Sequence, residues 1–397
     1  MQLRYGFRLY PTPGQRMALS RAFGCARVAF NDALRARQEA YQAGRPNLTG
    51  AGLSARLTAA KATPERCWLG EVSAVVLQQA LADLDAAYRN FFASRTGTRK
   101  GPKIGAPKFR SRKDHRQAIR FTANARFRVL PNGKLRLPKI GDVPVRWSRP
   151  LPSRPSSVTV IKDAAGRYFA SFVIRTGPDA LPGTDAVIGV DLGLRHFAVL
   201  SDGRKIASPR FLRRAEKKLR RAQQSLSRKQ KGSRNREKAR VKVARAHARV
   251  TDARRDFHHQ LSTALIRDNQ AVAVEDLAVK GQARTTLAKS VHDAGWSGFV
   301  GMLEYKARLY GRAFHRIGRF VPTSQTCSAC GIKDGPKPLQ VREWQCPGCG
   351  AWLDRDVNAP VNVAMAAGLA VTACGAQVRP GPALAQRGEA GTLRGAA

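Results

Sequence analysis

The sequence is poor in acidic residues for its length. It has 27 Asp and Glu against 71 Lys and Arg, so 397 residues have a formal net charge of +44. An excess of this size repels itself strongly unless a polyanion lies nearby, and the candidate polyanions are nucleic acid and an anionic membrane surface. The charge argues against ordinary small-molecule metabolism. The sequence also has no Walker loop and no Gly-rich dinucleotide fingerprint.

Long apolar segments are missing as well. No run of eighteen apolar residues occurs, which excludes a membrane span. The first eight residues, MQLRYGFR, have no apolar signal core, so we expect a cytosolic protein. Hydrophobic residues still make up 43% of the chain, which is enough to build cores, and the length predicts two or three domains.

Cysteines are few and unevenly spaced. Three are scattered, and we interpret them as small buried or idle thiols: Cys25, Cys67 and Cys374. The other four form two Cys-x-x-Cys pairs with fifteen residues between the pairs, the spacing of a zinc ribbon: Cys327, Cys330, Cys346 and Cys349. Four thiolates at roughly 2.3 Å complete a tetrahedron and leave no open position. The predicted zinc is therefore structural.

The first half of the chain alternates between strand and helix patterns. We predict a strand over 3–10, helices with apolar faces at 19–34 and 77–91, and mostly connecting loop over 42–70. A β-rich region with basic outer positions follows, with strands at 119–121, 127–129, 135–137, 157–162 and 167–175. Such strands can form a nucleic-acid-binding barrel, and simple solvated sheet faces are the alternative.

Beyond a linker at 181–183, the pattern becomes that of a second domain. Short buried strands are expected at 186–190, 196–200 and 271–274, followed by a helix over 296–314 and a strand over 314–321. After residue 366 the chain is rich in Ala, Gly and Pro without a period, which predicts a disordered tail.

A strongly basic segment lies inside this second domain. Residues 213–255 contain 18 Lys or Arg and three acids. Charge runs are often solvated faces or disordered tails. Here the helix formers and sparse apolar positions favour an ordered helical hairpin that turns at 231–233. We expect it to contact phosphates, with four candidate residues: Arg234, Arg236, Lys238 and Arg240.

Three acids end or begin predicted elements. Asp191 and Glu275 each end a buried strand, and Asp356 lies at the start of a helix. Carboxylates that converge at a sheet edge suit Mg²⁺, and two such ions can activate water and stabilise a departing phosphodiester oxygen. The alternative is ordinary, because an Asp in such a place is often a cap or turn residue.

Five motifs resemble one family in the right order. The segments 189–193 (GVDLG), 274–277 (VEDL) and 354–359 (DRDVNA) resemble the three motifs of RuvC-like nucleases of the RNase H fold. The segment 323–331 (TSQTCSACG) and the opening 7–12 (FRLYPT) resemble the TnpB (OrfB) proteins of bacterial insertion sequences. The resemblance covers about residues 3–366.

The resemblance implies an RNA-guided, Mg²⁺-dependent DNA endonuclease, related to type V CRISPR effectors, that works in the bacterial cytosol with a guide RNA and double-stranded target DNA. It assigns Asp191, Glu275 and Asp356 as the catalytic metal-binding acids, with Asp276 and Asp354 as lesser candidates. Pro360 departs from the family pattern, and we expect a first helical turn to tolerate it.

The implied fold is multi-domain α+β. It has a wedge-like β-barrel (1–10 and 117–178), a helical, HTH-like recognition region (11–116), a RuvC-like nuclease domain (183–322 and 351–366), a zinc ribbon (323–350) and the tail (367–397). Two other functions remain open: a transposase that catalyses DNA strand transfer with the same acids, and a non-cleaving nucleic-acid-binding regulator.

Overall fold

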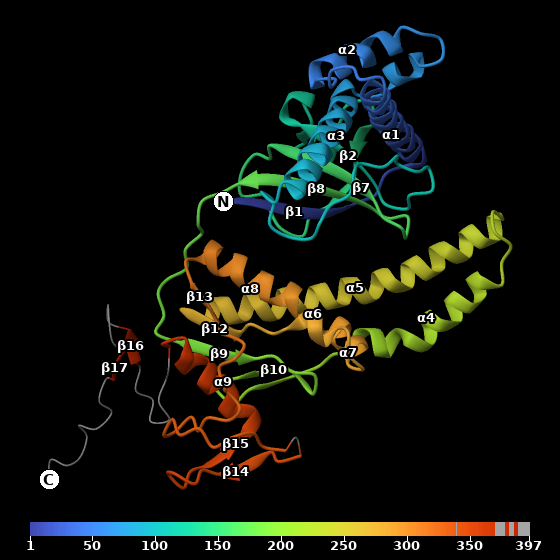
Figure 1. Cartoon of the computed structure of the whole chain (residues 1–397). Coiled ribbons are helices and arrows are strands. Elements are labelled where there is room, and N and C mark those ends of the chain that lie inside the picture. Colours follow the sequence, from blue (N-terminus) through green and yellow to red (C-terminus); the bar gives the residue numbers. More distant parts are fainter. Residues whose placement is uncertain (339, 370–377, 381–384, 388–397) are drawn as a thin grey trace. The chain divides into compact units, whose positions relative to one another are not determined.

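The computed structural model describes residues 1–338, 340–369, 378–380 and 385–387. The chain divides into two compact units, Met1–Thr176 and Gly177–Ala397 (Figure 1). Each unit has its own hydrophobic core. No helix among the described residues is long and apolar enough to cross a membrane.

The first unit is built on a five-stranded antiparallel sheet. Its order is β2-β7-β8-β1-β6, and a separate three-stranded sheet has the order β3-β4-β5. The strands are β1 (Gln2–Leu9), β2 (Gln117–Thr122), β3 (Arg128–Val129), β4 (Leu135–Leu137), β5 (Gly141–Val143), β6 (Val145–Arg146), β7 (Ser157–Lys162) and β8 (Tyr168–Arg175). The predicted strand positions are confirmed.

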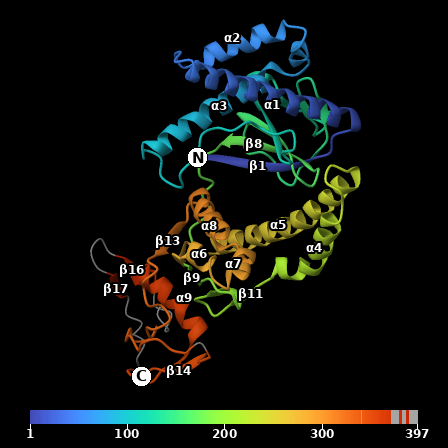
Figure 2. The same ribbon diagram turned by 45° about the vertical axis from the view of Figure 1, so that its right-hand side comes forward.

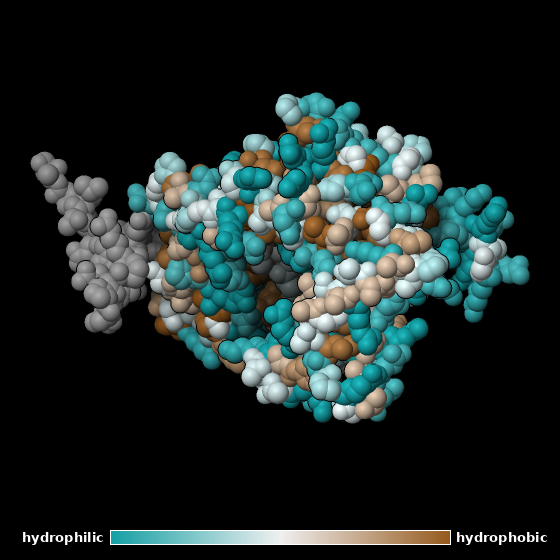
Figure 3. All heavy atoms as spheres, turned by 90° about the horizontal axis from the view of Figure 1, so that it is seen from above, coloured by the Kyte–Doolittle hydropathy of each residue, from teal (hydrophilic) through white to brown (hydrophobic). Residues whose placement is uncertain are grey.

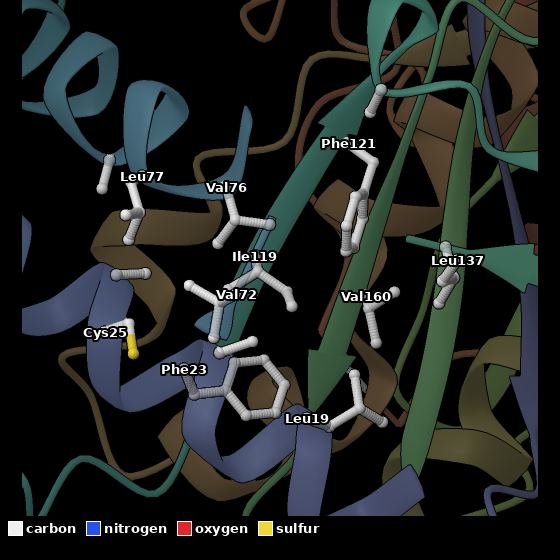
Figure 4. Packing of buried hydrophobic residues seen from close by; sticks show 14 of the residues in the cluster. Leu19, Phe23, Cys25, Val72, Val76, Leu77, Ile119, Phe121, Leu137 and Val160 are labelled. Carbon is white, nitrogen blue, oxygen red and sulfur yellow. The ribbon is translucent and has the colours of Figure 1, made fainter. Parts of the chain in front are cut away.

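Two long helices cover this sheet. Helix α1 (Pro13–Gln42) begins at a capping box between Thr12 and Gln15, in which each side chain accepts a hydrogen bond from the backbone amide of the other residue. Helix α3 (Ala74–Arg95) packs beside it. Figure 4 shows apolar side chains from α1, α3 and the strands meeting in one core, including Leu19, Phe23, Leu77, Ile119 and Phe121. The helices and the sheet therefore form one unit and not separate modules.

The predicted barrel is wrong. Residues 1–176 are all described, and within them no strand pairing joins the edge strands β2 and β6. Strand β6 is only two residues long and follows Pro144, which has no amide hydrogen to donate. Helices α1 and α3 cover apolar residues that a barrel would enclose. The sheet therefore buries its apolar face without closing on itself.

The segment 42–70 was also predicted wrongly as mostly loop. It contains helix α2 (Gly50–Lys61) and a short 3₁₀ helix η1 (Cys67–Glu71). Thr49 caps α2 by accepting a hydrogen bond from the Gly52 amide. Leu53 and Leu57 anchor the helix in the core of the unit. Its many small residues conceal this pattern in the sequence.

The second unit contains a mixed five-stranded sheet. Its order is β11-β10-β9-β12-β13. Strand β10 runs antiparallel to both β11 and β9, whereas β9, β12 and β13 run parallel to one another. The strands are β9 (Val187–Asp191), β10 (His196–Leu200), β11 (Lys205–Ala207), β12 (Ala271–Glu275) and β13 (Ala313–Ile317).

Helices cover both faces of this sheet. Helices α5 (Arg234–Asp268) and α8 (Trp296–Tyr310) share a core with alternate strand residues such as Ile188 and Val272. Helix α9 (Arg355–Ala366) packs on β9, β10 and β12, and its Val363 clusters with Ala273 of β12. Because side chains alternate along a strand, the residues at odd-numbered positions of β9 and β12 face α9.

The basic segment forms the predicted helical hairpin. Helices α4 (Phe211–Ser227) and α5 pack along each other. The C-terminal part of α5 covers the sheet, and the turn between the two helices lies at the end of the hairpin that extends away from it (Figure 2). The turn contains Gly232 in a left-handed conformation (φ 88°), which glycine adopts without strain. The carboxylate of Asp293 anchors the base of the hairpin by accepting hydrogen bonds from the amides of Leu212 and Arg213.

The remaining elements are short. Helices α6 (Val279–Gln282) and α7 (Ala288–Ala294) precede α8, and strands β14 (Glu343–Gln345) and β15 (Trp352–Asp354) form a hairpin before α9. The predicted disordered tail falls mostly outside the described residues. Within it, β16 (Val378–Pro380) and β17 (Ala385–Arg387) pair antiparallel.

Candidate functional site

Asp191 and Glu275 lie side by side at the carboxyl ends of the neighbouring strands β9 and β12 in the second sheet. Each is the last residue of its strand, and the parallel register pairs Val274 with Val190. The next residues along, Glu275 and Asp191, therefore emerge together at the carboxyl end of the strands. Both lie at odd-numbered positions, so their side chains are on the face that α9 covers.

Asp356 approaches from α9, in its first turn. Its neighbour Asp354 is the N-cap, whose carboxylate accepts hydrogen bonds from the amides of Asp356 and Val357. Asp354 also forms an ion pair with Lys205 at 2.6 Å. Asp354 is thus engaged as a cap, whereas among the described residues Asp356 forms a single ion pair, at 3.1 Å, with the half-exposed Arg342.

The electrostatics of these acids indicate excess negative charge. Burial, together with the charge of Asp356, raises the pKa of Asp191 to about 6. Burial raises the pKa of Glu275 to about 7, with further contributions from Asp191 and Asp276. Among the described residues, no Lys or Arg forms an ion pair with Asp191 or Glu275. When two carboxylates lie close together without a counter-ion, their mutual repulsion disfavours ionisation of both. A bound cation would remove this repulsion.

Asp276 behaves differently from its neighbour. Its carboxylate forms ion pairs with Arg319 at 2.5 Å and with Arg316 at 3.9 Å. The hydrogen bond from Arg319 lowers the pKa of Asp276. An acid already neutralised by two arginines is a weaker metal ligand than Glu275, in agreement with its lesser place in the sequence analysis.

Gly189 allows α9 to lie directly on the sheet. A Cβ atom added at Gly189 would lie 1.9 Å from the carbonyl oxygen of Pro360 and 2.9 Å from the amide nitrogen of Ala364. Both are backbone atoms, so a larger residue cannot fit unless the helix moves. Pro360 is the sixth residue of α9 and lies beyond the first turn in which it was expected. The helix continues to Ala366 despite it.

The four paired cysteines converge. Their sulfur atoms all lie within 4.8 Å of one another, and among the described residues they are the one group of three or more His, Cys, Asp or Glu side chains this close. The Cys327 and Cys349 sulfurs are 3.8 Å apart, and those of Cys330 and Cys346 are 3.6 Å apart. The three acids are more widely spaced than this limit.

The two cysteine loops, residues 323–332 (the first) and 346–351 (the second), share the same pattern of backbone hydrogen bonds. In each loop the first cysteine amide donates to the carbonyl five residues ahead, and a glycine amide donates back to that cysteine's carbonyl. The glycines, Gly331 and Gly350, have φ of 79° and 71°. The amides of Cys349 and Gly348 lower the pKa of the Cys346 thiol, whereas the pKa values of Cys330 and Cys349 are raised, in part by burial and by the neighbouring thiols.

Comparison with known proteins identifies the family. Residues 171–286 match the family described as "Probable transposase" (OrfB_IS605), residues 296–363 the "Cas12f1-like, TNB domain" and residues 1–46 a "Helix-turn-helix domain" of the same OrfB group. A Streptomyces pristinaespiralis protein named "Putative RNA-guided DNA endonuclease" is 44% identical, over 95% of this chain and 92% of its own. The chain belongs to the TnpB (OrfB) family.

A second relative and a solved structure agree with this TnpB assignment. The protein of Escherichia coli (strain K12) named "Putative RNA-guided DNA endonuclease InsQ" is 30% identical over 96% of both chains. The structure titled "Cryo-EM structure of the Cas12f1-sgRNA-target DNA complex" has a TM-score of 0.51 at 13% identity. It covers 88% of this chain and 82% of its own chain, which shows a shared fold.

Two asparagines of this TnpB chain escaped the sequence analysis. Asn358 and Asn362 are buried on α9, and both side-chain amides donate to the carbonyls of Thr323 and Thr326. The Asn358 carbonyl oxygen accepts from the Ser328 amide at 2.8 Å. These bonds tie the first cysteine loop to the helix that bears Asp356. Their signal in the sequence is two amides four residues apart on an otherwise apolar helix face.

The four predicted phosphate contacts of the hairpin are not equivalent in this TnpB structure. Arg234 and Lys238 are exposed. Arg236 instead donates to the carbonyls of Leu226 and Lys229, which closes the turn between α4 and α5. Arg240 forms an ion pair with Glu237. Of the four, only Arg234 and Lys238 are exposed to solvent.

Replacing Gly189 with Ala should damage the site of this TnpB chain without removing any acid. The new methyl group collides with the backbone of α9, so the helix must shift and take Asp356 with it. We expect a loss of stability on the order of 3 kcal/mol, typical of a severely overpacked site. Thermal unfolding measures it. Gly183→Ala is the matched control, because an added Cβ there meets nothing within 4 Å; equal melting curves for the two variants would contradict the close approach.

Proposed function

We propose that this chain is an RNA-guided, Mg²⁺-dependent DNA endonuclease of an insertion sequence, and that its second unit is a RuvC-like domain of the RNase H fold. The observation that supports this most directly is the pair Asp191 and Glu275 at the ends of neighbouring parallel strands, with Asp356 facing them from α9. The names of the two relatives support the same activity.

The strand order supports the nuclease fold. An antiparallel meander of three strands followed by two parallel strands places β9 in the middle of the sheet. The first motif, which ends at Asp191, thus lies on the central strand, and the second motif lies on the strand beside it. Helix α9 crosses both strands, so all three motifs meet at one edge.

The acids fit Mg²⁺ as a donor set. Carboxylate oxygens are hard ligands, and the raised pKa values of Asp191 and Glu275 reflect a charge that no basic side chain neutralises. Asp191, Glu275 and Asp356 would hold the metal. Bound there, Mg²⁺ would supply a polarised water and stabilise charge on the phosphodiester. Basic side chains beside the three motifs, Lys205, Arg319 and Arg342, would attract the nucleic-acid backbone toward the acids.

The four cysteines fit one structural Zn²⁺. A tetrahedron with Zn–S distances of about 2.3 Å has edges of about 3.8 Å. Two of the sulfur separations, 3.6 and 3.8 Å, agree with this value, and all of them lie within 4.8 Å. Four soft thiolates favour zinc over Mg²⁺ and leave no position for a substrate.

The partners proposed are a guide RNA and double-stranded target DNA. The net charge of +44 favours binding to a polyanion, and the hairpin of α4 and α5 supplies a long basic surface. Hydrophilic residues are numerous on the face in Figure 3, with hydrophobic residues in small groups between them. Phosphate contacts of this kind bind a duplex by its backbone, and base pairing with the guide would select the sequence.

One experiment tests the function as a whole. The protein is purified from cells that express it with its flanking element, the bound RNA is sequenced, and the complex is incubated with DNA that matches or does not match that RNA. We expect a defined bound RNA and cleavage of the matching DNA alone, dependent on Mg²⁺. Joining of DNA ends without RNA would indicate a strand transferase, and binding without cleavage would indicate a regulator.

The hairpin provides a prediction about salt dependence. In the double variant R234Q/K238Q we expect weaker nucleic-acid binding and a shallower slope of log affinity against log salt, by about 0.9 per lost phosphate contact. The melting temperature should not change. R236Q is the contrasting variant: it should lower the melting temperature, because the carbonyls of Leu226 and Lys229 lose their donor. Identical slopes for wild type and R234Q/K238Q would show that the exposed pair contacts no phosphate.

A further inference from the structure

The first unit contains a cavity of about 850 Å³ that the proposed nuclease site does not use. It lies between the loop from β6 to β7, residues 147–155, and the segment 123–129 after β2. Aromatic and apolar side chains line it together with three arginines, Arg128, Arg149 and Arg154, and no acidic residue lines it. The cavity therefore combines an apolar surface with a concentrated positive charge.

The apolar part is held in place by its surroundings. The Trp147 ring lies 4.6 Å from the ring of Phe7 and stacks on Phe172 at 5.7 Å. Its indole N–H donates to the Gly133 carbonyl at 2.7 Å, so the ring cannot rotate freely. Val129 is 42% exposed, which leaves its side chain open to a ligand.

The charged part is available for an anion. All three arginines are exposed, and within the fully described residues 1–176 none of them forms an ion pair with a carboxylate. The guanidinium of Arg149 lies over the ring of Tyr5 at 4.9 Å, which fixes its direction without neutralising it. Three guanidiniums around one cavity can bind phosphate oxygens through paired N–H donors.

The loop that forms one wall is rigid. It contains Pro150, Pro152 and Pro155, each of which fixes its own backbone φ. Ser153 and Ser156 fasten it to β8, since their hydroxyls donate to the carbonyls of Arg175 and Val173. A pre-formed cavity loses little conformational entropy when a ligand binds.

We propose that this cavity binds an unpaired nucleotide, with the base against Trp147 and Val129 and the phosphates on the three arginines. A flat ring attached to an anion is the chemistry that an aromatic wall beside guanidiniums recognises, as in single-strand binding proteins. An apolar peptide would not use three unpaired arginines. This part of the proposal rests on the proposed function: the nucleotide would belong either to the guide RNA or to the target DNA.

The test uses the full-length chain and two tetranucleotides, one of RNA and one of DNA, each with one 5-iodouracil. Affinity is measured by fluorescence anisotropy, and the crosslinked peptide is identified by mass spectrometry after irradiation. The test variants are R128Q/R154Q and V129D. The matched control is R4Q/R146Q, which removes two exposed arginines of the same unit that do not line the cavity. All variants must melt like the wild type.

We expect both test variants to bind at least tenfold more weakly, and the control to change less than twofold. The crosslink should map to residues 123–129 or 147–155, and each lost phosphate contact should lower the salt slope by about 0.7. Tighter binding of one tetranucleotide identifies the source strand. Equal losses in test and control variants, or crosslinks elsewhere, overturn the proposal. This test measures binding and not cleavage. If the wild-type protein failed to cut DNA in the separate cleavage experiment, that result would contradict the proposed nuclease activity and leave the proposal about this cavity standing.

Discussion

Asp191→Ala is expected to reduce cleavage of guide-matched DNA by at least about a thousandfold while nucleic-acid binding stays largely intact. Glu275→Ala and Asp356→Ala should have effects of similar size, because ligands of one metal cluster act as a unit and one missing ligand already disables it. For the same reason the triple variant should be little worse than each single variant. Affinity comes mainly from basic contacts to phosphate, which these changes leave in place.

The control for this experiment is Asp354→Ala. Asp354 is two residues from Asp356 but caps α9 and pairs with Lys205. Its removal should lower the stability by about 1 kcal/mol, as for other N-caps, and reduce cleavage only modestly. Cleavage by each purified variant is measured with binding in parallel. If Asp354→Ala were inactive and Asp356→Ala cut normally, the third ligand would be Asp354, and the reading of α9 would have to be reversed.

The acids could be found in the sequence because their positions follow from local rules. A buried strand that ends in an acid presents that acid at a sheet edge, and two such strands in parallel bring their acids together. Asp191 and Glu275 follow this rule in the structure. The cysteines could be found for a similar reason, since two cysteines separated by two residues can present both thiolates to one metal ion.

The barrel and helix α2 could not be predicted in the same way. Strand positions come from alternation within a few residues, whereas closure of a sheet depends on whether its two edges meet, which no local pattern records. In this chain, α1 and α3 cover the sheet, and the edges stay apart. Helix α2 has only Leu53 and Leu57 as buried anchors, too few for a clear period among its small residues.

The roles of Asn358, Asn362 and Arg236 were also hidden. Their side chains bond to backbone carbonyls far away in the sequence or across a turn. Composition counts Arg236 as one more positive charge. Only the folded hairpin reveals that it holds the turn together, and only the folded helix reveals that both asparagines hold the first cysteine loop.

Cys346→Ser should disable the enzyme through its structure, although residue 346 is no part of the acidic site. A serine hydroxyl is a poor zinc ligand, so the site would lose one thiolate of four and bind metal weakly. Both cysteine loops connect to α9. The second leads through β15 into the helix, and the first is bonded to Asn358 and Asn362. Loss of the metal should therefore release the helix that positions Asp356.

The expected results are loss of about one zinc per chain in elemental analysis, a lower melting temperature and at least a tenfold loss of cleavage. Asn362→Ala separates the two links in this argument. It keeps all four thiolates, so zinc content should stay at the wild-type level, yet two hydrogen bonds to the first loop are gone and cleavage should fall several-fold. Cys67→Ser is the matched control, because Cys67 is an exposed thiol of the first unit and lies outside the cluster. Full activity of Cys346→Ser without zinc would show that α9 is held by the sheet alone, through its packing over Gly189.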